Sequence, residues 1–92
     1  MKIPARIKIG ANTVFIERRP RAEIDGECNG GWAMWESNKL ILANDMPEDR
    51  EAVTFMHEIL HFINVYFEEQ LVTNISESLM QVIRDNNIDF RK

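Results

Sequence analysis

The only two histidines of the chain lie in one short segment, His57-Glu58-Ile59-Leu60-His61. In a helix, residues four apart share a face and lie about 6 Å apart along the axis, so both imidazoles can reach one ion. Neutral imidazole nitrogen is a preferred ligand of zinc. Glu58 follows the first histidine, roughly 100° around the helix, where its carboxylate can reach a water beside the ion. The spacing therefore predicts a metal site with a general base next to it.

The same residues could instead be surface histidines on a polar helix face, because five-residue matches also arise by chance. We favour the metal site because the segment lies in the middle of a sequence with helical periodicity. An apolar stripe is offset from the histidines, so the helix can bury one side and present ligands on the next. The stripe consists of Ala52, Met56, Ile59, Leu60, Ile63 and Phe67. With zinc bound, the chemistry expected is hydrolysis of a peptide bond by an activated water, with Glu58 as base.

A catalytic zinc usually has three protein ligands, and the chain has no third histidine. The candidates are Cys28 and three downstream carboxylates, those of Glu68, Glu69 and Glu77. If the first helix continued unbroken, Glu68 would lie about 10 Å along the axis from His61, too far for one ion. The chain must therefore reverse after His61 and return a glutamate from a second helix. Spacing alone leaves Glu69 and Glu77 open, since Asn74 as a helix cap would place Glu77 in a capping box.

The elements that must position these residues are indicated by a change of period near residue 45. Apolar alternation predicts strands over residues 3–9, 13–18, 32–35 and 40–43. From Pro47 the period becomes 3.6, which predicts a first helix carrying the histidines and a second over residues 71–83. The expected fold class is α+β: a small antiparallel sheet of two hairpins, packed against the histidine-bearing helix and a second, C-terminal helix. Residues 1–92 are expected to form a single domain.

Composition narrows the function further. The chain has 92 residues, with 11 Lys and Arg against 15 Asp and Glu, and a net charge of −4. This charge argues against nucleic acid as the main ligand, because phosphate binding needs a cationic face. No apolar run reaches the ~20 residues of a membrane span, and the first residues lack the apolar region of a signal peptide. A single cysteine cannot form an internal disulfide, so we expect a cytoplasmic protein.

The segment Phe55–Ile63 resembles the active helix of gluzincin-type zinc metallopeptidases. Most of the chain is similar to small phage and bacterial proteins grouped with the ImmA/IrrE-type peptidases, also called minigluzincins. The similarity includes a hairpin with a glycine turn, a glycine-rich stretch before a short strand at Gly30-Gly31-Trp32, and a helix begun by proline. The resemblance implies a zinc metallopeptidase whose third ligand is a glutamate that opens the second helix. The segment from Glu69 to Ser76 is similar to that pattern, so the resemblance points to Glu69.

The leading hypothesis is a minimal zinc metalloendopeptidase with His57, His61 and Glu69 as ligands and Glu58 as base. Its substrate would be a peptide or protein segment laid in extended form beside the strand over residues 32–35. Trp32 and Trp35 could equally be core residues. The alternative is a metal-stabilised binding or regulatory module with little turnover, encoded by a phage or bacterium, because so short a chain has little room for specificity pockets.

Overall fold

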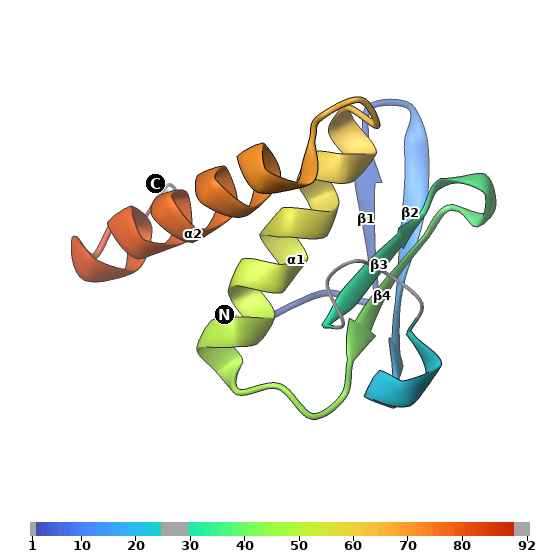
Figure 1. Cartoon of the computed structure of the whole chain (residues 1–92), viewed down its shortest axis with the longest axis horizontal. Coiled ribbons are helices and arrows are strands. Elements are labelled where there is room, and N and C mark those ends of the chain that lie inside the picture. The colour runs from blue at the N-terminus through green and yellow to red at the C-terminus, as the bar shows by residue number, and fades with distance from the viewer. Residues whose placement is uncertain (1, 25–29, 90–92) are drawn as a thin grey trace.

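The computed structural model describes residues 2–24 and 30–89 (Figure 1). In this part of the chain, a four-stranded sheet is followed by two α-helices. The strands are β1 (Arg6–Ile9), β2 (Asn12–Arg19), β3 (Gly31–Met34) and β4 (Lys39–Ala43). The helices are α1 (Glu48–Ile63) and α2 (Glu69–Asp85), with short 3-10 helices η1 (Arg21–Glu23) after β2 and η2 (Trp35–Ser37) between β3 and β4.

The sheet has the strand order β1-β2-β4-β3. The pairs β1–β2 and β3–β4 are antiparallel hairpins, as the sequence predicts, and the α+β class is confirmed. The two hairpins meet through β2 and β4, which run parallel, so the sheet as a whole is mixed rather than antiparallel throughout. Pairing the second arms of both hairpins leaves β3 at an edge. This edge strand contacts the histidine-bearing helix, as does its neighbour β4.

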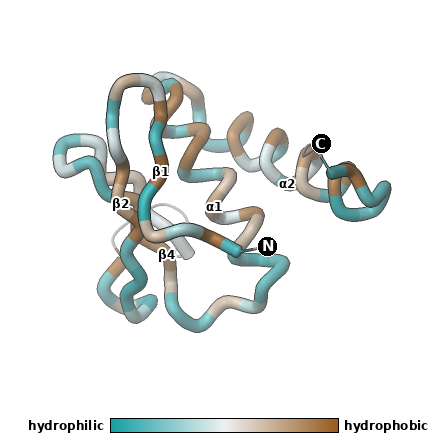
Figure 2. The backbone as a smooth tube through the Cα atoms, turned by 180° about the vertical axis from the view of Figure 1, so that it is seen from behind, coloured by the Kyte–Doolittle hydropathy of each residue, from teal (hydrophilic) through white to brown (hydrophobic). Residues whose placement is uncertain are grey.

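The main core lies between one face of the sheet and α1. Alternating residues of β2 and β4 point to this face, as expected for strands with one face packed on a helix. Its buried residues are Val14, Leu40, Leu42 and Phe55. A smaller cluster of Ile24, Ile41 and Ala43 lies on the opposite face. Figure 2 shows hydrophobic segments alternating with hydrophilic ones along the strands and both helices.

The second helix was expected to pack on the sheet, but it packs on α1 instead. It lies across α1 and extends beyond the sheet (Figure 1). Its buried residues are Val72, Ser76 and Met80, each four apart, which gives a narrow contact stripe. The Ser76 hydroxyl donates to the Val72 carbonyl at 2.8 Å, so the small side chain is satisfied within its own helix. No helix in the described ranges is both long and apolar enough to cross a membrane.

The first helix ends earlier than its apolar stripe suggested. It stops at Ile63, whose side chain is exposed, and Phe67 lies in the connection. Asn64 makes the turn, because its side-chain oxygen accepts from the Tyr66 N–H at 2.9 Å and its carbonyl accepts from the Phe67 N–H at 3.1 Å. Such local bonds are typical of asparagine turns. The α1–α2 connection therefore needs no glycine or proline.

Candidate metal centre

His57 and His61 lie one turn apart on α1 and turn their Nε2 atoms toward a single carboxylate. His57 Nε2 is 2.9 Å from Oε2 of Glu69, and His61 Nε2 is 2.9 Å from Oε1 of the same residue. The two rings lie edge to face with centroids 4.9 Å apart. In the described part of the chain these three residues form a group that could hold a metal ion, with ligand atoms all within 4.8 Å of one another.

The donor set suits a divalent transition metal. Two imidazole nitrogens and one carboxylate are the protein ligands of one well-known type of catalytic zinc site, which leaves a further position for water. Atoms bound to one zinc at about 2.0–2.2 Å must lie within about 4.4 Å of each other, and each imidazole nitrogen already meets this limit with its Glu69 oxygen. The metal itself is not identified by this geometry, because the same donors accept manganese or iron.

Glu69 reaches the histidines because it is the first residue of α2. Its neighbour Glu68 has a different role: its carboxylate caps α2 by accepting from the Leu71 N–H at 3.0 Å. Glu77 lies two turns further along α2 and lines the adjoining pocket without an ion pair to either histidine. Asn74 lies inside α2 rather than capping it, so the capping-box alternative, which favoured Glu77, is wrong in its premise.

The protonation state of His57 favours metal binding. The side chain is only 5% exposed, and its burial is the main reason that its pKa is lowered. The Glu69 carboxylate acts in the opposite direction, because it favours the charged imidazolium. Burial therefore holds this imidazole in the neutral form, which is the form that binds metals.

Glu58 is buried beside the centre, between α1 and β3. Its side chain is 3% exposed, and burial, aided by the negative charge of Glu69, raises its pKa to about 8. A hydrogen bond from the Ala33 backbone N–H to the carboxylate opposes this rise. A carboxyl group whose pKa lies near neutrality is suited to exchange protons. A divalent cation at the histidines would favour its ionised form.

Gly31 allows β3 to approach Glu58. A Cβ atom at this position would lie 2.8 Å from Cγ2 of Thr54 and 3.0 Å from both Cγ and Oε2 of Glu58. Real Cβ contacts are almost never shorter than 3.0 Å, so a larger residue fits only if the side chains of Thr54 and Glu58, or the elements that carry them, shift. The glycine pair before β3 was noted in the sequence, but its contact with the base could not be read from it.

Trp35 contacts the end of the metal-binding helix. Its indole Nε1–H donates to the His61 carbonyl at 3.0 Å, which satisfies one of the free carbonyls in the last turn of α1. The sequence predicted that this residue lies in a strand, but it belongs to η2. Asn38 adopts a left-handed conformation there and closes a tight turn. Trp35 is 46% exposed, whereas Trp32 is half-buried on the far face of the sheet.

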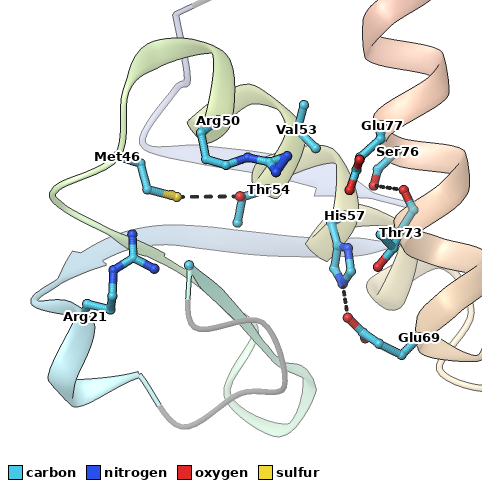
Figure 3. Close-up of a pocket in the computed structure, with 11 residues that line it drawn as sticks. Arg21, Met46, Arg50, Val53, Thr54, His57, Glu69, Thr73, Ser76 and Glu77 are labelled. Carbon is cyan, nitrogen blue, oxygen red and sulfur yellow. Dashed lines mark hydrogen bonds and ion pairs between the residues drawn. The ribbon is translucent and has the colours of Figure 1, made fainter.

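A pocket of about 280 Å³ opens directly beside His57 and Glu69 (Figure 3). Its walls come from the facing sides of α1 and α2, together with residues of η1 and of the segments before β3 and α1. They include Arg50, Val53 and Thr54 on α1, Thr73, Ser76 and Glu77 on α2, and Arg21, Gly30 and Met46. Arg50 and Thr73 were not predicted as site residues, although both lie at helical spacing from the predicted ligands. Cys28, the remaining candidate ligand, lies outside the described residues.

Comparison with known proteins adds no relative: no family model, curated protein or solved structure matches the chain.

Proposed function

We propose that the chain is a minimal zinc-dependent metallopeptidase of the gluzincin type. The observation that carries this proposal is the convergence of two imidazole nitrogens on one carboxylate, each nitrogen 2.9 Å from a Glu69 oxygen, with Glu58 on the same helix as the histidines. His57, His61 and Glu69 would hold the metal ion. The resemblance of the segment Phe55–Ile63 to the active helix of that class supports the same conclusion.

When bound, the ion would supply Lewis acidity that polarises the scissile carbonyl and makes a water more acidic. Glu58 is the base that takes the proton from this water and then delivers it to the leaving amine nitrogen. The buried carboxyl group between α1 and β3 suits this role, because burial raises its pKa and a divalent cation at the histidines would favour the ionised form that accepts a proton. Burial also keeps bulk water away from the proton that is transferred.

The substrate would be a peptide in extended form along β3, as inferred from the sequence. β3 is an edge strand, and the Ala43 N–H donates to the Gly30 carbonyl. Antiparallel alternation then directs the backbone groups of Gly31 and Ala33 away from β4, where a peptide strand could pair. The Ala33 N–H already donates to Glu58, so such a peptide would pair mainly through the other groups of this edge.

A binding module with little turnover is the second candidate, and one observation favours it. Glu58 is not among the described residues that line the pocket beside the centre, and its carboxylate is occupied by the Ala33 N–H. In that case the Glu58 carboxylate would have a structural role, because this hydrogen bond joins α1 to β3. The two candidates differ in whether Glu58 affects turnover or only folding.

The test is a Glu58→Gln variant, which keeps the size of the side chain and removes its basicity. Zinc-loaded wild-type protein and variant are incubated with a mixture of peptides from a digested bacterial proteome, and products are identified by mass spectrometry. We expect cleavage by the wild-type protein, no cleavage by the variant and equal zinc content in both. A Glu23→Gln variant at an exposed position of η1 is the matched control and should cleave normally.

Cleavage that persists in Glu58→Gln would exclude this mechanism. If neither protein cleaves any peptide although both bind zinc, the binding module is the better description.

A further inference from the structure

We infer that the pocket beside the metal centre is a subsite for an acidic group, with Arg50 as the residue that recognises it. The ligand would be a carboxylate on the substrate peptide, within about two residues of the bond that is cut. This inference rests on the proposed function and specifies its substrate class.

The pocket runs along α1 away from the metal ligands. Arg50, Val53 and His57 are spaced by three and four residues and share one face of α1. Glu69, Thr73 and Glu77 have a similar spacing on α2, so two facing helix sides form much of the pocket, which Arg21, Gly30 and Met46 complete. At about 280 Å³ it is smaller than the usual site for a drug-sized molecule and suits one or two side chains.

Arg50 stands at the opposite end of this groove from the ligands. Seven residues separate it from His57, which is about 10 Å along the helix axis. In Figure 3 its side chain extends along α1 toward His57 and Glu77, which shortens the gap. A peptide residue spans about 3.3–3.6 Å when extended, so a side chain close to the scissile bond can reach the guanidinium.

Arg50 is also free to bind a ligand. Within residues 2–24 and 30–89 it has no hydrogen bond or ion pair, whereas Arg21 in the same pocket is paired with Asp45 at 3.0 Å. A guanidinium presents a planar set of donors that matches a carboxylate in two parallel hydrogen bonds. An unpaired arginine in a concave site is therefore suited to an acidic group.

Glu77 is the group that opposes this preference. It lines the same pocket from α2 and makes no ion pair with Arg50. Glu69 is committed to the histidines, and a divalent cation there would more than balance its charge. With the cation bound, the positive charges of the ion, Arg21 and Arg50 exceed the negative charges of Glu69, Glu77 and Asp45. The pocket should prefer an anion, and more strongly once the charge of Glu77 is removed.

The test uses two small metal chelators, so that it does not depend on turnover. Glutaric acid monohydroxamate and pentanohydroxamic acid differ only in a carboxylate that replaces a methyl group. Their affinities for the zinc-loaded protein are measured by calorimetry. We expect the carboxylate compound to bind about tenfold more tightly to the wild-type protein, as one charge-assisted hydrogen-bond pair allows.

Two variants with opposite expected effects make the test specific. Arg50→Gln should abolish the tenfold preference while leaving the affinity for pentanohydroxamic acid unchanged. Glu77→Gln should increase the preference. A wild-type protein without preference, a preference that Arg50→Gln retains, or no binding of either compound would overturn the subsite. Carboxylate selectivity without peptide cleavage would instead reject the proposed peptidase activity and leave the subsite intact.

Discussion

At the scale of single residues, four neighbouring carboxyl groups have different roles in and around the centre. Glu69 meets both histidines, Glu68 caps α2, Glu77 lines the pocket and Glu58 is buried against β3. Their surroundings decide these roles more than their residue type does. Burial gives Glu58 a raised pKa, and an N–H at the start of α2 occupies Glu68.

The buried carboxyl group of Glu58 predicts a pH dependence of stability in the metal-free protein. Its pKa is about 8 when folded, against an ordinary value of 4.5. Between these values the folded protein holds a proton that the unfolded chain has lost, so the free energy of unfolding falls as the pH rises. Glu58→Gln should remove this fall. The free energy of unfolding of the variant minus that of the wild-type protein should therefore be larger at pH 8 than at pH 5, by more than about 1 kcal/mol.

The measurement is urea unfolding of both proteins at the two pH values with a chelator present. His57 contributes a slope of opposite sign, because its pKa is lowered on folding, but it does so in both proteins. The difference between them therefore reports Glu58. An identical pH dependence in the two proteins would contradict the buried, protonated carboxyl group.

At the scale of elements, the centre depends on how closely β3 and α2 approach α1. Gly31 lets β3 lie against Thr54 and Glu58, and Ser76 is a small residue in the α2 contact with α1. Trp35 joins the turn after β3 to the last turn of α1 through the His61 carbonyl. Two parts of the fold thus hold α1 in place. One is β3 with the turn after it, which carries no metal ligand, and the other is α2, which carries one.

The close approach at Gly31 predicts that Gly31→Ala costs about 1–3 kcal/mol, as overpacking of a buried contact usually does. Thr54→Ser removes the methyl group nearest to the new Cβ, which would otherwise lie 2.8 Å away. Combining the two substitutions should therefore recover part of the loss. A double-mutant cycle from denaturant unfolding measures the coupling, and strictly additive effects would show that the contact is looser than described.

The sequence predicted the elements better than their packing. Alternation and helical spacing located both hairpins, the helix with the histidines and the second helix, because these are local patterns. The apolar stripe continued to Phe67 and placed the end of α1 too late, whereas the metal-ligand argument correctly required the chain to reverse after His61, where Asn64 turns it. The parallel pairing of β2 with β4 and the packing of α2 on α1 were also missed, because they depend on contacts far apart in the chain.

The candidate site was more predictable than the fold around it. Helical spacing sufficed to place His57 and His61 together, and the resemblance pointed to Glu69, which the structure places against them. Spacing could not separate Glu69 from Glu77, because the choice depends on where α2 begins. Trp35 and Gly31 gave no sequence signal for their contacts, since each meets α1 through the tertiary fold. Arg50 lies at helical spacing from His57, but the pocket that joins them depends on where α2 packs.

At the scale of the whole molecule, a chain of 92 residues has a small core on which metal binding should have a large effect. Most of the buried apolar residues in the described ranges form two small clusters, one on each face of the sheet. The metal ligands come from α1 and α2, and these two helices pack directly on each other. A bound ion would join the two helices directly.

Zinc should therefore stabilise the folded protein. At 100 times its dissociation constant, a ligand that binds only the folded state adds about 2.7 kcal/mol to the free energy of unfolding. For a domain of this size the melting temperature should rise by about 10–20 °C. Differential scanning calorimetry with and without zinc measures the rise, and His61→Ala should show little of it. An equal rise in the variant would place the zinc elsewhere.

The central claim is that His57, His61 and Glu69 together bind one divalent cation. Zinc titration against a competing chromophoric chelator tests it on the wild-type protein and on His57→Ala, Glu69→Gln and Glu77→Gln. We predict one zinc per chain in the wild-type protein, affinity lowered at least about tenfold in the first two variants, and a change of no more than a few-fold in Glu77→Gln. Equal zinc affinity in the wild-type protein and His57→Ala would contradict the account.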